Sequence, residues 1–346
     1  MKTAFIHIGT HKTGTTFLQQ WLHRHLKQMQ EAGIYVPETG RMRKEAQHKH
    51  LSAPIREWLP ESDVPDIWQR LGAEIRDRPE DILLSAEHFT RSMLATNRAN
   101  RLMAYLESLG YRVVLILFLR DQVSYMNSRY CQEAKRFITV GPFEAYLNRW
   151  QNNVIFNYDR MTARLERLNA ELRVFPFPPR DQTIQSVLVE TLGITPFAEQ
   201  PVARANESMG PKTIFAARLF ANRTRLNRRL KKRGPGERQR RLDELRRLTA
   251  PMRKSNFELG WNSDKFMGFT PETAEAARLR FAAGNDEVAL RYWGMTWAEM
   301  HDSITPASNE IDLESPDPAV LAEVLEFIEP LLPKAERIIA AEGAIS

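Results

Sequence analysis

Four short apolar runs, separated by longer segments of mixed polarity, dominate the pattern of this chain. The runs are Thr3 to Ile8, Ile82 to Ser85, Val113 to Leu119 and Leu172 to Phe177. Each has the length of a buried strand. The segments between them have helical spacing, and this alternation is typical of a parallel sheet with helices on both faces. The pattern therefore predicts an α/β fold with three layers.

The segment after the first predicted strand has one apolar face. Its apolar residues recur with helical spacing, at Phe17, Trp21, Leu22, Leu26 and Met29. A helix over this segment would bury one side against the sheet. The sequence GIYVP, residues 33–37, ends the helix and predicts a short edge strand.

The second half of the chain has a different character. Residues 204–254 are polar and basic and contain KKRGPGE at residues 231–237. We predict a sheet-containing core over residues 1–200 and a mainly helical insertion or subdomain over 201–300, which returns to the core near 281–297. The acidic segment 301–346 is expected to form a closing amphipathic helix that packs on the core.

The charge distribution sharpens this division. The net charge of the 346 residues is +6. Residues 218–254 hold fifteen Lys or Arg against three acids, whereas residues 301–346 hold ten acids against two basic residues. The basic segment indicates either an anionic partner, a membrane surface or a solvated helical face that the acidic segment balances.

The compartment is inferred from three simple features. A single cysteine, Cys131, excludes an internal disulfide framework and suggests a reducing compartment. The first residues, MKTAFIHIG, do not have the pattern of a secretory signal. No apolar run approaches the roughly 20 residues of a membrane helix. We expect a cytoplasmic protein, with contact to the inner membrane surface through the basic segment as a further option.

The first strand leads into a glycine-containing loop, IHIGTHKTGTTFLQ. Gly9 and Gly14 have the spacing of a phosphate loop, in which the backbone N–H groups and the helix dipole face an anion. In nucleotide triphosphatases a lysine follows the second glycine. Here Thr15 occupies that position and Lys12 lies two residues before Gly14. The loop therefore favours an anion other than a magnesium triphosphate, or else it is a simple turn.

A second candidate anion contact follows the third apolar run. The segment VVLILFLRDQVSYMNSRY places Arg120 at the end of a strand and Ser128 eight residues later. A guanidinium binds phosphate in a fork, and a hydroxyl in the next helix could donate to the same group. Taken alone, Arg120 could equally pair with Asp121 or with solvent.

Together these motifs resemble the sulfotransferases that use 3′-phosphoadenosine 5′-phosphosulfate (PAPS). Within that superfamily the chain most resembles bacterial glycan-type enzymes, through the loop Thr10 to Thr16, the element Ser85-Ala86-Glu87, and Arg120 with Ser128-Arg129-Tyr130. The resemblance implies a three-layer P-loop-like fold with PAPS as co-substrate and adenosine 3′,5′-bisphosphate as product. An Arg-Lys-Gly element, which closes over the cofactor in cytosolic aryl and steroid sulfotransferases, is not evident.

The resemblance also implies roles for individual residues. The cofactor-binding residues would be His11, Lys12, Thr13, Gly14, Thr15, Thr16, Arg120 and Ser128. Lys12 would neutralise the bridging oxygen as the S–O bond breaks, and the loop's N–H groups would hold the remaining oxygens. No metal is required by this scheme.

The acceptor hydroxyl needs a general base. Glu87 is the first candidate, because it follows a buried strand and should lie beside the loop at the carboxyl edge of the sheet. It could instead form a structural ion pair or a helix cap. His50, in QHKHLS, and His88 are the alternatives. The His-x-His pairs at residues 23/25 and 48/50 lack a matching cysteine or carboxylate cluster, so we do not predict a zinc site.

The acceptor itself is only partly constrained. A hydroxyl of a glycan or glycolipid is expected, lying near the basic segment 218–254. The competing interpretations are a P-loop kinase that uses ATP and a polyanion- or nucleic-acid-binding protein, although we do not expect a nucleic-acid partner. The sequence leaves the oligomeric state open.

Overall fold

A computed structural model describes residues 1–42, 45–56, 63–137, 140–179, 181–197, 209–230, 234–250, 257–301 and 306–340. The chain divides into two compact units. Unit 1 comprises residues 1–122, 152–205 and 278–303, and unit 2 comprises residues 123–151, 206–277 and 304–346. The chain passes between the units at residues 122/123, 151/152, 205/206, 277/278 and 303/304, and residues 281–297 lie in unit 1. The domain boundaries expected near residues 200 and 300 stay predictions.

Unit 1 contains a five-stranded sheet in the order β2-β3-β1-β4-β5. The strands are β1 (Lys2–Gly9), β2 (Ile34–Tyr35), β3 (Asp81–Ser85), β4 (Tyr111–Arg120) and β5 (Glu171–Phe177). Every pair is parallel. All four predicted strands and the short edge strand are confirmed. Because the strands are parallel, β1, β3 and β4 end at the same edge of the sheet, and the residues after them meet there.

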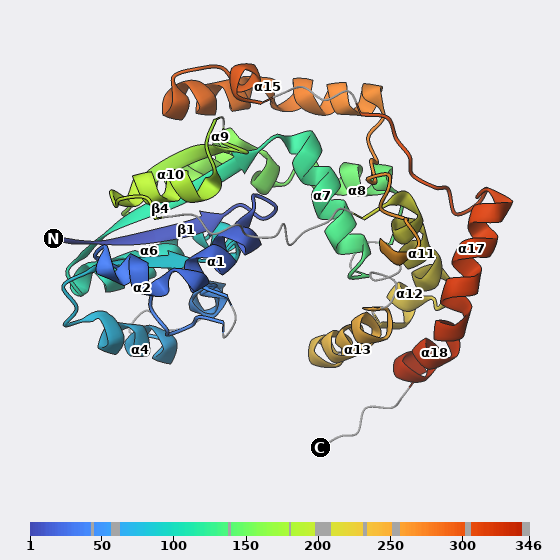
Figure 1. The fold of residues 1–346 in the computed structure, drawn as a ribbon, viewed down its shortest axis with the longest axis horizontal. Helices are drawn as coiled ribbons and strands as arrows, with labels where there is room; N and C mark the ends of the chain where they lie inside the picture. The colour runs from blue at the N-terminus through green and yellow to red at the C-terminus, as the bar shows by residue number, and fades with distance from the viewer. Residues whose placement is uncertain are drawn as a thin grey trace. The chain divides into compact units, whose positions relative to one another are not determined.

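Helices flank the sheet, and Figure 1 shows the strands of unit 1 running between them. The helices and turns within unit 1 are α1 (Thr15–Arg24), α2 (Leu26–Glu31), η1 (Lys49–Ser52), α3 (Ala53–Arg56), α4 (Asp66–Ile75), α5 (His88–Met93), α6 (Thr96–Ser108), η2 (Val154–Phe156), α9 (Tyr158–Leu165), α10 (Ile184–Leu192) and α16 (Trp297–Met300). Two further helices, α7 (Gln122–Ala134) and α15 (Pro271–Trp293), have residues in both units.

The apolar face predicted after β1 is confirmed, although the predicted helix is divided into α1 and α2 at His25. Trp21, Leu22 and Met29 are buried in one cluster with residues of β1, β3, β4 and α10. On β4 this cluster takes alternate residues, such as Ile116 and Phe118, as the pleat of a strand requires. The intervening residues of β4 are buried too, so the sheet is covered on both faces. The fold is therefore α/β with a parallel sheet between helices.

Unit 2 is helical where the structure describes it. Its helices are α8 (Phe143–Trp150), α11 (Pro211–Arg223), α12 (Leu226–Leu230), α13 (Pro235–Leu248), α17 (Pro318–Ile328), η3 (Glu329–Leu331) and α18 (Leu332–Ala340). The C-terminal segment was expected to pack on the core of residues 1–200, but it belongs to unit 2. The reason is its apolar face, because Val324 and Ile339 share a buried cluster with Phe220 and Leu245 of α11 and α13.

Ion pairs join the basic segment to the acidic one. Arg218 contacts Glu310 at 2.5 Å and Arg229 contacts Glu336 at 2.5 Å, while Arg241 donates to the carbonyl oxygen of Ile338 at 2.6 Å. Part of the basic charge therefore holds the C-terminal helices in place within unit 2. Other arginines of the segment are exposed, namely Arg223, Arg225, Arg228, Arg238, Arg240 and Arg247.

The longest helix of the described ranges is α15, with 23 residues. Charged residues are spread along it, from Glu272 to Arg291. Neither α15 nor any other described helix combines the length and the apolar character that crossing a bilayer demands.

Candidate active site

The loop between β1 and α1 is held by hydrogen bonds to backbone carbonyl oxygens. The N–H of Thr10 donates to the carbonyl oxygen of Phe118 at 3.1 Å, which ties the loop to β4. The hydroxyl of Thr13 donates to the carbonyl oxygen of Thr10 at 2.6 Å, which closes the loop on itself. The hydroxyl of Thr13 is thus used inside the loop, and its side chain is fully buried.

Three residues of the loop adopt positive φ angles. Gly9 has φ 105°, Lys12 has φ 67° and Gly14 has φ 69°. Glycine adopts this region without strain, whereas a lysine does so at a cost on the order of 1 to 2 kcal/mol. An ideal Cβ on Gly14 would lie 3.1 Å from the ring of Phe177, at the end of β5. The loop therefore requires glycine at its two ends and holds Lys12 in an uncommon backbone conformation.

Gly9→Ala is expected to destabilise the protein. An added Cβ would lie 2.9 Å from Thr90 Oγ1 and 3.2 Å from Glu87 Cα, in addition to the strain at φ 105°. The matched control is Gly110→Ala, because Gly110 also has positive φ but its Cβ would meet nothing within 4 Å. Chemical denaturation should show a loss of roughly 1 to 3 kcal/mol for Gly9→Ala, larger than the loss for Gly110→Ala. Equal losses would show that Gly9 does not pack closely against Thr90 and Glu87.

The first turn of α1 offers donors to an anion. Gly14 caps this ten-residue helix without a side-chain hydrogen bond, and the first turn contains no acidic residue. The first N–H groups of a helix have no partner inside the helix, and the helix dipole adds positive potential there. Thr15 is buried and Thr16 is half-buried. The backbone around Gly14 can therefore hold an anion of phosphate or sulfate type.

Arg120 lies beside this loop. Its Nη1 donates to the carbonyl oxygen of Lys12 at 3.0 Å, and its guanidinium lies 5.9 Å from the ring centroid of Phe177. The Tyr158 hydroxyl holds the carbonyl oxygen of Arg120 at 2.6 Å. Burial lowers the pKa of Arg120 from its usual value, against the opposing charge of Asp121. The structure thus brings together two predicted anion-binding residues, Lys12 and Arg120.

Ser128, the predicted partner of Arg120, comes eight residues after it in the chain. It lies on α7 and belongs to unit 2. Its side chain is half-buried. A role for Ser128 in binding the same phosphate stays a prediction.

Glu87 lies two residues after the end of β3, next to the loop. Its carboxylate is flanked by two imidazoles, since His11 Nδ1 is 3.9 Å and His88 Nδ1 is 3.8 Å from Oε1. The rings of His11 and His88 are themselves 5.6 Å apart, edge to face. The side chain makes no capping hydrogen bond to α5. Glu87 occupies the N-cap position of α5, but its side chain belongs to this polar cluster and does not cap the helix.

Two amides also hold Glu87. Gln47 Nε2 donates to both carboxylate oxygens, at 3.2 and 3.0 Å, and Gln19 Nε2 donates to Oε2 at 3.3 Å. Burial by itself would raise the pKa of Glu87, but the charge of His11, the residue's own N–H, the charge of His88 and the Gln19 amide together lower it below its usual value. Glu87 is thus an ionised carboxylate at neutral pH.

Two more histidines are linked to this cluster through Ser85. His7 and His48 are fully buried, and burial lowers the pKa of each to about 4. His7 Nδ1 lies 2.8 Å from Ser85 Oγ, and His48 Nδ1 accepts from the N–H of Ser85 at 3.1 Å. Both imidazoles are therefore neutral near pH 7 and act as fixed hydrogen-bonding groups.

His50, the other candidate base, has a different setting. It lies in the short turn η1 and its side chain is exposed. The neighbour two positions earlier, His48, is the histidine of QHKHLS that joins the buried network. Sequence reasoning also missed Gln19 and Gln47, although Gln19 lies four residues after Thr15 and hence on the same side of α1.

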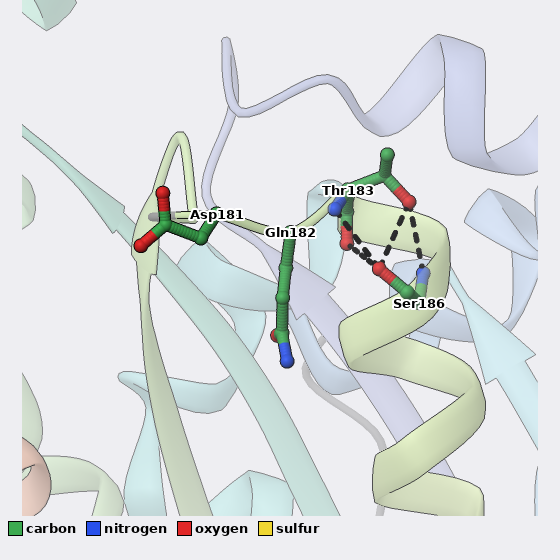
Figure 2. Close-up of a pocket in the computed structure, with 4 residues that line it drawn as sticks. All are labelled: Asp181, Gln182, Thr183 and Ser186. Carbon is green, nitrogen blue, oxygen red and sulfur yellow. Dashed lines mark hydrogen bonds between the residues drawn. The ribbon is translucent and has the colours of Figure 1, made fainter.

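A separate hollow of about 570 Å³ opens after β5. It is lined by Asp181, Gln182, Thr183 and Ser186. In Figure 2 the hydrogen bonds between Thr183 and Ser186 close the capping box at the start of α10, while the side chains of Asp181 and Gln182 extend away from that pair. Among the lining residues that the structure describes, none is a predicted site residue. Its helix is nevertheless a neighbour of the loop, since an ideal Cβ on Gly14 would lie 3.7 Å from Ile184 Cδ1.

Comparisons of the chain with protein-family models, with curated proteins and with solved structures return no match.

Proposed function

We propose that this protein is a sulfotransferase that moves a sulfuryl group from PAPS to an acceptor hydroxyl. The proposal rests chiefly on one observation, the position of Lys12. This lysine lies inside the loop between β1 and α1, before Gly14, and its carbonyl oxygen is held by Arg120 at 3.0 Å. Thr15 occupies the position at which a triphosphate site has its lysine. The P-loop-like form of the fold is part of the same proposal.

The donor would bind along the edge of the sheet. The N–H groups of residues 13–16 would hold the non-bridging oxygens of the 5′-phosphosulfate, and the hydroxyls of Thr15 and Thr16 would add donors. Arg120 would meet the 3′-phosphate, because a guanidinium binds phosphate with two parallel hydrogen bonds. His11, which lies beside Glu87, would add a hydrogen-bond donor on that side of the loop. These roles fit a sheet edge at which the N-terminus of α1, Lys12 of the loop and Arg120 of β4 lie together.

The reaction exchanges one S–O bond for another. The acceptor oxygen attacks sulfur as its proton passes to a base, and the bridging S–O bond breaks with its electron pair on the 5′-phosphate. The products are the sulfate ester and adenosine 3′,5′-bisphosphate. Lys12 would stabilise the negative charge that develops on the bridging oxygen, and positioning with electrostatics supplies most of the rate enhancement in transfers of this type.

Glu87 is the proposed general base. It is ionised, lies next to the loop and is accessible, with 15% of its side chain exposed. Glu87→Gln should lower the release of adenosine 3′,5′-bisphosphate from PAPS by about 10²-fold or more, since positioned acid–base groups contribute factors of this size. His50→Ala should leave the rate near that of the native protein. If Glu87→Gln turns over normally and His50→Ala is inactive, the assignment is wrong.

The acceptor is proposed to be a hydroxyl of a glycan or glycolipid, reached in the cytoplasm or at the inner membrane surface. The exposed arginines of α13 would favour an anionic acceptor or surface. A protein that only binds polyanions is less well supported, because Arg218, Arg229 and Arg241 of the basic segment contact carboxylates or carbonyl groups within unit 2.

Calorimetric titration with adenosine 3′,5′-bisphosphate and, separately, with ATP and magnesium tests the proposal. Binding of the bisphosphate supports sulfuryl transfer. Binding of ATP with magnesium alone would support a P-loop kinase, which is the main alternative.

A further inference from the structure

The amides that hold Glu87 form a chain with a defined direction. Gln47 Nε2 donates to Gln19 Oε1 at 3.3 Å as well as to Glu87. Gln19 Nε2 in turn donates to Glu87 Oε2 and to Ser85 Oγ, both at 3.3 Å. With Gln19 turned the other way, its carbonyl oxygen would face a carboxylate and two acceptors would repel one another. The direction therefore runs from Gln47 through Gln19 to Glu87 and Ser85.

The far end of this chain is closed by neutral groups. Since Ser85 Oγ accepts from Gln19, its own proton can be donated to His7 Nδ1, 2.8 Å away. His48 accepts from the N–H of Ser85 and donates its Nε2–H to the carbonyl oxygen of Pro37 at 2.8 Å. His7 and His48 are neutral near pH 7, so neither provides a buried positive charge that would attract the carboxylate of Glu87. The carboxylate is consequently directed toward His11 and His88, which are 29% and 36% exposed.

Gln19 also connects Glu87 to the loop. It is fully buried and lies on α1, the same helix whose first turn would hold the donor. The backbone carbonyl oxygen of Gln19 accepts from the N–H of Ala46 at 3.1 Å, which positions the segment that carries Gln47. One rigid helix thus fixes the distance between the anion-binding turn and the carboxylate.

We propose that Gln19 and Gln47 are positioning residues, whose amides keep Glu87 ionised and aimed at the exposed edge of the cluster, where the acceptor hydroxyl would lose its proton. The inference rests on the proposed function, because it assigns Glu87 a part in that reaction. A hydrogen bond to a charged group is stronger than one between neutral groups, and a carboxylate stripped of such bonds is protonated at higher pH.

The test uses the full chain with Gln47→Met, which keeps the length of the side chain and removes its amide. Gln47 is only half-buried, so this variant should fold. Gln30→Met is the matched control, because Gln30 also donates to a carboxylate, Glu80 at 3.1 Å, but on an exposed site of unit 1. The buried Gln19→Met repeats the test from the other amide. The first readout is the protonation of Glu87, followed by carbon NMR of its labelled carboxyl group across pH.

In Gln47→Met the midpoint of this titration should move to higher pH, and in Gln30→Met it should not move. The acidic limb of the kcat/KM profile, measured as release of adenosine 3′,5′-bisphosphate from PAPS, should shift in the same direction. At acidic pH this corresponds to a loss on the order of tenfold, the factor that one charged hydrogen bond can supply.

An unchanged midpoint in both Gln47→Met and Gln19→Met would overturn the inference, whatever the reaction is. A midpoint that rises while the rate profile stays in place would also overturn it, since the amides would then act on a carboxylate outside the reaction. Calorimetry with adenosine 3′,5′-bisphosphate on the same variants keeps the two proposals distinguishable, because donor binding tests the sulfotransferase function without Glu87.

Discussion

Lys12→Ala should lower the rate of sulfuryl transfer by at least about 10²-fold, the loss that follows removal of one preorganised electrostatic group. The lysine is expected to act on charge that develops as the bridging S–O bond breaks, so kcat should fall more than donor affinity. Its backbone conformation, at φ 67°, is set by the loop and by Arg120 rather than by its side chain. The variant should therefore fold with the loop unchanged.

Release of adenosine 3′,5′-bisphosphate from PAPS measures this loss. Lys27→Ala is a suitable control, because Lys27 lies on α2 with 87% of its side chain exposed and pairs only loosely with Glu31 at 3.5 Å. The control should keep the native rate. A Lys12→Ala protein that turns over as fast as Lys27→Ala would contradict the role given to this lysine.

Arg218→Ala should cost unit 2 roughly 3 to 5 kcal/mol of stability, because breaking a buried pair leaves an uncompensated charge. The Arg218 side chain is 4% exposed and its Nη1 contacts Glu310 Oε1 at 2.5 Å. Glu310 also accepts from the Tyr130 hydroxyl at 3.3 Å and from the N–H of Phe143 at 3.0 Å. Without the arginine, this carboxylate would remain inside the unit with only neutral partners.

The stability lost in Arg218→Ala should depend on pH. Burial raises the pKa of Glu310, and the charge of Arg218 opposes that rise. Removal of Arg218 should raise the pKa of Glu310 further. Glu310 then binds its proton more tightly in the folded state than in the unfolded state. The stability lost in Arg218→Ala should therefore be small at acidic pH, and it should grow as the pH rises above the pKa that Glu has in the unfolded chain.

Chemical denaturation followed by circular dichroism at two pH values checks this prediction. Arg229→Ala is the control, since its pair with Glu336 is partly exposed, with 32% and 47% of the side chains accessible. An exposed pair contributes about 0 to 1 kcal/mol. Equal losses in the two variants would show that the Arg218 pair does not carry a buried charge.

Much of the fold could be predicted because local pattern and topology agree. Apolar runs of strand length, separated by amphipathic segments, indicate a parallel sheet, and neighbouring parallel strands end at one edge. That rule is what brings Glu87, after β3, and Arg120, at the end of β4, to the loop that follows β1. The motif in the loop after β1, together with Glu87 and Arg120, was sufficient to predict which edge of the sheet carries the candidate site.

The amides around Glu87 could not be found in the same way. Gln47 lies in a connection with no periodic pattern, and it meets Glu87 over a separation of forty residues. Glutamines are common on solvated helix faces, so Gln19 carries no local signal of burial. Gln19 and Gln47 reach Glu87 only because α1 packs against the end of β3 in the folded protein.

The histidines of QHKHLS show a similar limit. His48 and His50 differ by two positions, and the composition of the segment does not distinguish them. The turn η1 leaves His50 exposed, whereas His48 is buried against Ser85 and Pro37. Likewise, Arg218 and Glu310 are 92 residues apart. A count of charges indicated that the acidic segment balances the basic one, but not which residues pair.

Calorimetry of the native protein with adenosine 3′,5′-bisphosphate, compared with ATP and magnesium, tests the central claim most directly. Lys12→Ala and Arg120→Ala serve as site variants and Lys27→Ala as the surface control. We expect micromolar binding of the bisphosphate, weakened by Arg120→Ala and kept in Lys27→Ala, with no binding of magnesium ATP. Binding of magnesium ATP without binding of the bisphosphate would contradict the sulfotransferase assignment.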